Sequence, residues 1–361
     1  MVFGKAIADA VGMEGFVALP YLNPDIGPYT RRHVTLEQRK EHALKPDDIK
    51  LSNILVRYRP GTIVVLGIVF HNTHQHLMEE SPYGWKHFGR IDQEGLDAFE
   101  SWLNEETKNH RDVSFVLAES EKHRFIVILD DTVASFANVD IFAESDILLT
   151  SLTKSFSGQS DVMGGSIVLN PLSPHYPEIH SAISSTHRNE LFIADADVLL
   201  ANSRDFLQRA RRLNRNAHAM ATFLNSAIAD QNSPVVNVQY PALLPSKGLY
   251  DKFKRCSTKE LPEPGYGCLM TVEFKNVATA RAFYDRLGFY HSPHLGGHVT
   301  LALCYNMLLY SRNPEEIEYM RPRGVKEESV RISSGLEDLE DLIDTLKDAL
   351  DAALDSQKPE E

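Results

Sequence analysis

The chain has few cysteines, no long apolar run and no excess of positive charge. Its three cysteines, Cys256, Cys268 and Cys304, are widely spaced and form no C-x-x-C pair, so we expect reduced thiols and neither a disulfide framework nor a zinc site. No apolar stretch approaches the roughly 18 residues that a membrane helix needs, which argues against a membrane partner. The formal net charge of −13 argues against nucleic acid as a partner, because a polyanion would be repelled.

Targeting signals are also missing from residues 1–16, MVFGKAIADAVGMEGF. This stretch has one lysine, acidic residues and no sustained apolar core, so it resembles neither a secretory signal nor a transit peptide. With 43% hydrophobic and 24% charged residues among 361, the composition is that of a globular protein large enough for two domains. We therefore expect a cytoplasmic protein of two domains.

Short apolar runs alternate with polar, helix-forming stretches from residue 61 onward. Residues 96–107 carry apolar side chains at helical spacing. Strands that alternate with helices predict an α/β fold on a doubly wound parallel sheet, in which ligands gather beyond the carboxyl ends of the strands. The runs that predict strands are 61–70 (GTIVVLGIVF), 112–119 (DVSFVLAE), 124–131 (RFIVILDD), 145–152 (SDILLTSL) and 164–170 (GGSIVLN).

The C-terminal part of the chain predicts a smaller α+β domain. A long helical region is expected from about 195 to 230, followed by a proline-rich edge segment at 232–248. A strand at 267–274, a helix at 276–288, a strand and turn at 328–338 and a closing amphipathic helix follow. The expected boundaries are an N-terminal arm at 1–60, a large domain at 61–225, a small domain at 226–355 and a tail at 356–361.

Lys154 raises the main chemical question, because it stands just beyond an expected strand in the stretch DILLTSLTKSFSGQSDVMGG. Ser151 and Lys154 fit the S-x-x-K pattern of certain serine hydrolases, but the S-D-N and K-T-G elements that those enzymes also need are absent. An ordinary solvated lysine is the simplest alternative. A third interpretation is a lysine amine that holds an aldehyde cofactor as an imine.

The neighbours of Lys154 suit the third interpretation, with pyridoxal 5'-phosphate (PLP) as the cofactor. Ser151 and Thr153 offer hydroxyls to the phosphate. Asp130 ends the preceding strand and is placed to pair with the pyridine nitrogen, which keeps the ring protonated as an electron sink. Because an aspartate and a lysine at strand ends are common, these residues alone leave the solvated lysine open.

Several ordered motifs resemble those of the Cys/Met metabolism group of PLP enzymes, the cystathionine γ-synthase family. The stretch LDDTVASFANVDIFAESDILLTSLTKSFSGQSDVMGGSIVLNP is similar to the family's D-N-T, S-x-T-K and G-H-S-D-V-x-G-G series, and HSPHLGGHVTLAL and ESVRISSGLED are similar to later segments. The resemblance covers roughly residues 61–355 and is greatest to the fungal branch. It implies a PLP-dependent transferase fold of type I, with a mostly parallel sheet in the large domain and a smaller C-terminal α+β domain.

The resemblance also implies roles for single residues. Lys154 matches the Schiff-base lysine, Asp130 the pyridinium partner, and Ser151 and Thr153 the phosphate-binding hydroxyls. Phe70 falls where the family usually has a tyrosine stacked on the cofactor ring, so the stacking is kept but the phenol is lost.

Two further matches concern the substrate and a second subunit. Arg331 matches the arginine that binds the substrate α-carboxylate, a bidentate role suited to guanidinium. Tyr29 and Arg31 resemble a Y-S-R motif whose tyrosine and arginine reach the phosphate of a neighbouring subunit, which implies a homodimer or homotetramer. The alternative for Arg31 is a solvated pair with Arg32.

The function that the resemblance implies is γ-replacement on an O-acylhomoserine, with cysteine as the nucleophile. This is a trans-sulfuration step in amino-acid biosynthesis, and its substrates are small amino acids. The alternatives are a secondary-metabolic C–C or C–S γ-substitution, a C–S lyase and a pseudoenzyme. The family's Gly-Met and P-x-N-P segments have no counterpart after KPDDIKL and SFVLAE, and a divergent enzyme, a pseudoenzyme or a reading frame with skipped segments would each account for that.

Other patterns predict less. The histidines of HNTHQH (71–76) lack carboxylate or cysteine partners at metal-ligand spacing, so we expect a solvated helix start and no metal site. RARRLNR (209–215) is expected on the solvated face of the long helix. His294 and His298 either lie near the substrate pocket, as the resemblance implies, or pack within the domain.

Overall fold

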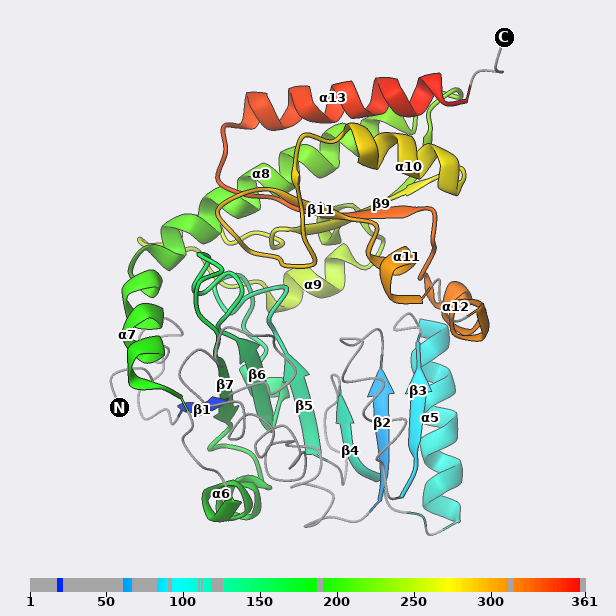
Figure 1. Cartoon of the computed structure of the whole chain (residues 1–361). Helices are drawn as coiled ribbons and strands as arrows, with labels where there is room; N and C mark the ends of the chain where they lie inside the picture. Colours follow the sequence, from blue (N-terminus) through cyan, green and yellow to red (C-terminus); the bar gives the residue numbers. More distant parts are fainter. Residues whose placement is uncertain are drawn as a thin grey trace, which may run out of the picture. The chain divides into compact units, whose positions relative to one another are not determined.

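The computed structural model describes residues 18–21, 61–66, 83–89, 93–109, 111, 113–117, 126–186, 191–310 and 314–357 (Figure 1). These residues belong to two compact units. The first unit is drawn from residues 1–132, 140–153 and 161–201, and the second from 133–139, 154–160 and 202–361.

A sheet of seven described strands forms the centre of the first unit. Its spatial order is β1-β7-β6-β5-β4-β2-β3. The strands are β1 (Ala18–Tyr21), β2 (Thr62–Leu66), β3 (Trp85–Phe88), β4 (Val113–Leu117), β5 (Ile126–Asp130), β6 (Ile147–Ser151) and β7 (Gly165–Leu169). All five predicted strand segments therefore contain a strand, while β1 and β3 were not anticipated.

The sheet is mostly parallel, as the fold class requires. Strands β3, β2, β4, β5 and β6 pair in parallel, but β7 runs antiparallel to β6 and β1 runs antiparallel to β7. The expectation of a mostly parallel sheet is confirmed, and β7 and β1 are the antiparallel strands among those described. A parallel neighbour needs a long crossover, usually a helix, whereas residues 152–164 form turns and return the chain directly.

Both faces of this sheet are covered by apolar side chains, which explains the continuous apolar runs. In β2, Ile63 and Val65 pack on one face with Ile179 and Ile183 of α6 (Tyr176–Thr186). Their neighbours in β2 pack on the other face with Phe99 of α5 (Gln93–Lys108). In Figure 1, α5 lies beside β3.

A smaller sheet lies in the second unit, and its strand order is β10-β11-β12-β9-β8. Its strands are β8 (Val235–Gln239), β9 (Leu269–Phe274), β10 (Tyr290–His291), β11 (Leu301–Leu303) and β12 (Ser329–Ser333). The pairings are antiparallel except for β10 with β11. The proline-rich segment supplies β8, which lies at the edge of this sheet as predicted.

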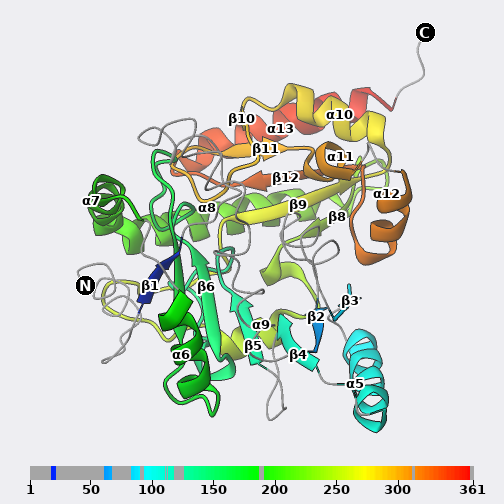
Figure 2. The same ribbon diagram turned by 60° about the horizontal axis from the view of Figure 1, so that its bottom comes forward.

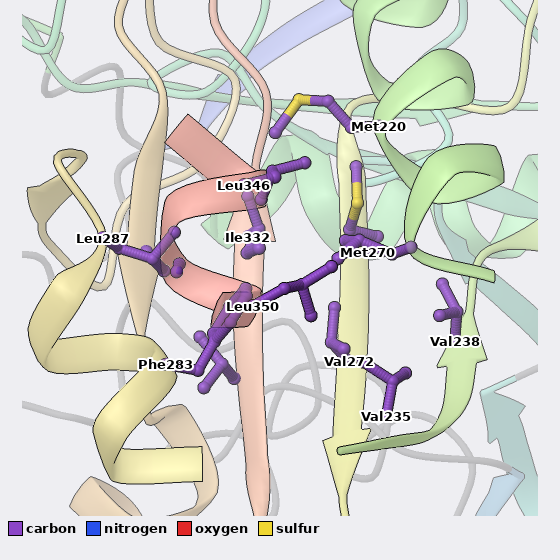
Figure 3. Close-up of a cluster of buried hydrophobic side chains, with 14 of the residues drawn as sticks. Met220, Val235, Val238, Met270, Val272, Phe283, Leu287, Ile332, Leu346 and Leu350 are labelled. Atoms are coloured by element: carbon purple, nitrogen blue, oxygen red, sulfur yellow. The ribbon is translucent and has the colours of Figure 1, made fainter. Parts of the chain in front are cut away.

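Three helices cover one face of the small sheet: α8 (Phe206–Ala227), α10 (Val277–Arg286) and α13 (Leu339–Asp355). Helix α10 begins where the Asn276 side chain accepts a hydrogen bond from the backbone N–H of Thr279. Figure 2 shows α10 and α13 side by side. Figure 3 shows Phe283 of α10 and Leu346 and Leu350 of α13 packed with Met220, Met270 and Ile332. The described part of the chain also contains α7 (Ile193–Asn202), α9 (Lys247–Phe253), α11 (Tyr305–Tyr310) and α12 (Pro314–Met320).

The long helical region predicted at 195–230 is two helices. A 3₁₀ turn at Ser203–Asp205 separates α7 from α8. The basic stretch at 209–215 is also not a uniformly solvated face, because the Arg209 side chain is only 4% exposed. Arg209 lies about one helical turn from Phe206 and from Leu213, and both of these side chains are buried. Arg209 is therefore on the buried face of α8.

Candidate active site

Lys154 directly follows Thr153, shortly after the end of β6, and its side chain is partly buried. Burial lowers the pKa of its amine from 10.5 to about 8, and the positive charge of Arg331 contributes to the lowering. An amine with such a pKa is neutral in about a tenth of the molecules at pH 7, far more than an ordinary lysine. It can therefore act as a nucleophile toward a carbonyl group or as a base.

The first unit holds Asp130 and Ser151 at the ends of neighbouring strands. Thr132 connects them, because its Oγ1 donates to Asp130 Oδ1 at 2.5 Å and accepts from the Ser151 backbone N–H at 2.8 Å. The Thr132 backbone N–H also donates to Asp130 Oδ1, at 2.9 Å. The carboxylate and the start of the Ser151–Lys154 segment are thus fixed relative to each other through one threonine.

The electrostatics of Asp130 combine two opposing effects. Desolvation by the surrounding protein raises the pKa of its carboxyl, and the hydrogen bonds from Thr132 lower it. The side chain nevertheless retains solvent access. Since desolvation is the larger effect, Asp130 is a carboxylate that would gain from a cationic partner.

The two hydroxyls predicted to bind the phosphate, those of Ser151 and Thr153, make different contacts. Ser151 Oγ is buried and has no hydrogen-bond partner among the residues that the structure describes. A buried hydroxyl without a partner is costly, so this atom suits an oxygen-rich ligand such as a phosphate. Thr153 Oγ1 differs, because it donates to Gly164 O at 3.3 Å and accepts from Gly164 N–H at 3.1 Å, which joins the two ends of the β6–β7 connection.

Arg331 lies in β12 of the second unit. Its guanidinium carbon stands 3.8 Å from the ring centroid of Tyr305, and Nη2 donates to the Pro293 carbonyl oxygen. Desolvation lowers the pKa of Arg331, with Tyr305 acting in the opposite direction. This partly buried arginine is held on an aromatic face, and its guanidinium has more N–H donors than this one carbonyl oxygen can accept. Such an arginine can bind a carboxylate.

Some predicted residues lie outside the part of the chain that the structure describes. These are Phe70, Tyr29, Arg31 and the histidines of segment 71–76. Within the described ranges, no group of three or more His, Cys, Asp or Glu side chains could hold a metal ion, and no helix is long and apolar enough to cross a membrane. The three cysteines are free thiols, as predicted.

Sequence reasoning missed Thr132 and Tyr305. Aspartate side chains often accept hydrogen bonds from residues two positions later in the chain. The contact of Thr132 with Asp130 could therefore have been predicted from the sequence. Tyr305 is far from Arg331 in sequence, and only the packing of α11 on β12 places its ring there.

Comparisons with known proteins agree with this architecture. The family model for Cys/Met metabolism PLP-dependent enzymes matches residues 64–351. Alanine racemase ungC of Aspergillus violaceofuscus is 36% identical over 248 residues, covering 67% of this chain and 41% of that protein. The cystathionine γ-synthase of Neurospora crassa is 35% identical over 235 residues, covering 65% of this chain and 35% of that protein.

The chain therefore spans about two fifths, or less, of the length of these two relatives. A solved structure is similar over a larger share. It is the cystathionine γ-synthase of Xanthomonas oryzae pv. oryzae in complex with cystathionine, with a TM-score of 0.72 at 20% identity, covering 98% of this chain and 86% of that one. This likeness supports the fold, type I of the PLP-dependent transferases.

Proposed function

We propose that this chain, which belongs to the Cys/Met metabolism family of PLP-dependent enzymes, catalyses γ-replacement on an O-acylhomoserine with cysteine as the nucleophile. The observation that carries the proposal is the Lys154 amine, whose pKa is lowered to about 8 just beyond the strand that ends in Ser151. A lysine of that kind is what an aldehyde cofactor requires.

The described residues fit PLP in three respects. The Ser151 hydroxyl is buried without a partner in the described part of the chain, as a phosphate ligand would be before its phosphate arrives. Asp130, held by Thr132, has a raised pKa and would be stabilised as an anion by a pyridinium. The Lys154 amine is nucleophilic, as imine formation requires. Lys154, Asp130 and Ser151 would therefore hold the cofactor. Thr153 stays a predicted phosphate ligand, although its hydroxyl is hydrogen-bonded to Gly164.

The proposed chemistry assigns a separate task to each residue. Bound PLP supplies an electron sink for the pair of electrons that remains when the α proton of the substrate leaves. Lys154 accepts that proton and moves protons between the α and β carbons. Arg331 binds the α-carboxylate and orients the substrate. The bond from Cγ to the acyloxy oxygen breaks, a carboxylate leaves, and the cysteine sulfur forms a new bond to Cγ after losing its proton.

A second candidate follows from the relative named alanine racemase in Aspergillus violaceofuscus. Racemisation also begins with removal of the α proton by a base, so Lys154 and Arg331 would serve it. A C–S lyase or another γ-substitution would use the same opening step and differ in the nucleophile. The pseudoenzyme alternative predicts none of these reactions.

One experiment separates these activities. The purified chain is incubated with PLP and either O-acetylhomoserine plus cysteine or L-alanine alone, and the products are identified by mass spectrometry after chiral derivatisation. We expect cystathionine with wild type and with the exposed-lysine control Lys275→Ala, and none with Lys154→Ala. Release of an oxo acid and ammonia, conversion of L-alanine to D-alanine, or no turnover would each contradict γ-replacement and indicate a lyase, a racemase or a pseudoenzyme.

We also propose a cytoplasmic homodimer or homotetramer. The oligomer is supported by the resemblance of Tyr29 and Arg31 to a motif that reaches a neighbouring subunit, and the location by the three free, widely spaced cysteines. Light scattering after size-exclusion chromatography tests the first statement. A monomer at micromolar concentration would contradict it.

A further inference from the structure

We propose that Arg209 is a positioning residue for Lys154. Its guanidinium holds the turn that starts at Lys154 and thereby fixes the direction in which the lysine side chain leaves the backbone. This inference rests on the proposed function, since it gives Lys154 the role of the cofactor-binding amine. Nothing in the family match or in the pattern of the RARRLNR stretch assigns such a role to Arg209.

The contacts of Arg209 concentrate on the residues just after Lys154. Nη1 donates to Ser155 O at 2.8 Å, and Nη2 donates to Phe156 O at 2.8 Å. Nη2 also donates to Asn202 O at 2.7 Å, and Nε donates to Asp205 Oδ1 at 2.8 Å. One guanidinium thus joins the two residues that follow Lys154 to the start of α8.

The burial of Arg209 shows that these contacts are needed. Its side chain is 4% exposed, and a buried guanidinium is stable only when its donors find acceptors. Hydrogen bonds in which one group is charged are about twice as strong as neutral ones. The Ser155 and Phe156 carbonyls are therefore held at fixed positions.

The turn from Lys154 to Gly158 is short, and two backbone hydrogen bonds hold it. The Gly158 backbone N–H donates to Lys154 O at 2.8 Å, and Gly158 O accepts from the His298 backbone N–H at 3.1 Å. A Cβ built on Gly158 would lie 2.2 Å from Arg209 Nη1, and its φ of +71° is in the glycine-favoured region. Gly158 is thus the residue that lets the arginine approach the turn.

Further contacts also confine the turn. A Cβ on Gly296 would lie 2.6 Å from Ser155 N, and the φ of Gly296 is +72°. The Phe156 ring packs against Phe136 and Phe206, with ring centroids 5.9 and 5.5 Å apart. Because Ser155 and Phe156 are held on several sides, the Cα–Cβ direction of Lys154 is restricted as well.

Orientation of a reacting group is worth large factors in rate, and a displacement of about 1 Å can cost roughly 100-fold. Lysine has four flexible methylenes, so a fixed backbone leaves fewer directions for the amine to explore. Loss of Arg209 should allow the segment to move and the amine to gain solvent. The amine would then titrate more like an ordinary lysine.

The test uses protein without cofactor, so that it does not depend on turnover. The pH dependence of Lys154 reductive methylation is read by peptide mass spectrometry in wild type, Arg209→Gln, Arg209→Lys and the control Arg211→Gln, an exposed arginine of the same helix. We expect a midpoint near 8 in wild type and in the control. Both Arg209 variants should move it upward by about one unit.

The design separates a positioning role from a merely structural one. Arg209→Lys keeps the positive charge, but its single nitrogen cannot reach the separate acceptors that Nε, Nη1 and Nη2 of the guanidinium contact, so a shift in that variant comes from geometry. This variant carries the test if Arg209→Gln does not fold. Midpoints equal to that of wild type in folded variants, checked by circular dichroism, would overturn the proposal.

A second readout distinguishes failure of this inference from failure of the proposed function. The rate at which PLP attaches to Lys154 should fall by about 10-fold in Arg209→Lys. If wild type does not take PLP onto Lys154, the proposed function fails. If wild type does so and Arg209→Lys matches its rate and its midpoint, only the positioning role fails.

Discussion

Thr132 donates its hydroxyl hydrogen to Oδ1 of Asp130 at 2.5 Å, and the same oxygen of Thr132 accepts the backbone N–H of Ser151. The ends of β5 and β6 are therefore joined by a side chain in addition to the backbone ladder of the sheet. Asp130 is the proposed partner of the pyridinium and Ser151 the proposed ligand of the phosphate. Thr132 thus orients two proposed cofactor contacts and need not touch the cofactor itself.

Replacement of Thr132 by valine should weaken PLP binding. The hydroxyl lowers the pKa of the Asp130 carboxyl, so its loss raises that pKa further and favours the uncharged form. A hydrogen bond to a charged group is worth about 1.5–3 kcal/mol, which corresponds to roughly 10- to 100-fold in affinity. The loss should be greatest at acidic pH. Titration with PLP measures it, Thr132→Ser should stay near wild type, and equal affinities for all three proteins would contradict the prediction.

Replacement of Ser151 by alanine should separate stability from cofactor binding. Because the buried hydroxyl finds no partner within the described ranges, its removal should leave the protein as stable as wild type or more stable by about 1 kcal/mol. Affinity for PLP should fall about 10-fold, and affinity for pyridoxal, which lacks the phosphate, should not change. Thermal unfolding and binding titrations measure both effects. A parallel loss of pyridoxal affinity would show that Ser151 is not a phosphate ligand.

Lys154 should destabilise the folded protein at neutral pH. Its pKa is lowered from 10.5 to about 8, so below pH 8 both the folded and the unfolded state hold the proton and the full cost of burying the ammonium is present. Between these values the unfolded chain holds more protons, and stability rises with pH. Lys154→Met should therefore increase the free energy of unfolding at pH 7, by on the order of 2 kcal/mol, and much less at pH 10. Urea unfolding at pH 7 and pH 10 measures this difference in the free energy of unfolding, with the exposed Lys275→Met as control. An equal increase in that free energy at the two pH values would contradict the prediction.

Tyr305 should support substrate binding through the face of its ring. Tyr305→Phe keeps the ring beneath Arg331 and should change the substrate KM little, whereas Tyr305→Ala should raise it by roughly 10-fold. Arg331→Lys should also raise KM, because an ammonium cannot bind a carboxylate at two points. PLP affinity should not change in any of these variants. Steady-state kinetics and PLP titration measure the two effects, and a PLP affinity that falls with KM would place Arg331 at the cofactor.

The small sheet and its three helices should depend on Leu346 of α13. This side chain is fully buried among Phe283, Ile332 and their neighbours, so Leu346→Ala should destabilise the second unit by about 2–5 kcal/mol. Leu308→Ala, at a side chain that is 52% exposed, is the matched control and should cost far less. Chemical denaturation measures both changes. Equal costs would mean that the core lies elsewhere.

The sequence predicted more of the fold than of the site. Runs such as 145–152 contain strands because their side chains are buried on both faces, and this produces a continuous apolar pattern. The direction of β7 could not be read from its composition, since direction depends on how residues 152–164 return. The break at Ser203–Asp205 was missed because its residues do not interrupt the polar pattern between the two helices.

For the site, Asp130 at the end of one strand and Lys154 just beyond the end of the next were predicted correctly. The binding roles assigned to them, and to Ser151, Thr153 and Arg331, stay predictions. Arg209 was misread because arginines usually lie on solvated faces, although its spacing from Phe206 and Leu213 placed it on the apolar stripe. A count of residue types does not reveal a buried charge, whereas helical periodicity could have done so.

The central claim is that Lys154 is the lysine that binds PLP. The most direct measurement is to incubate the purified chain with PLP, reduce it with borohydride and locate the pyridoxyl group by peptide mass spectrometry. We predict attachment at Lys154, and loss of that attachment in Lys154→Ala without transfer to another lysine. An unmodified Lys154, or equal labelling of exposed lysines such as Lys275, would contradict the claim.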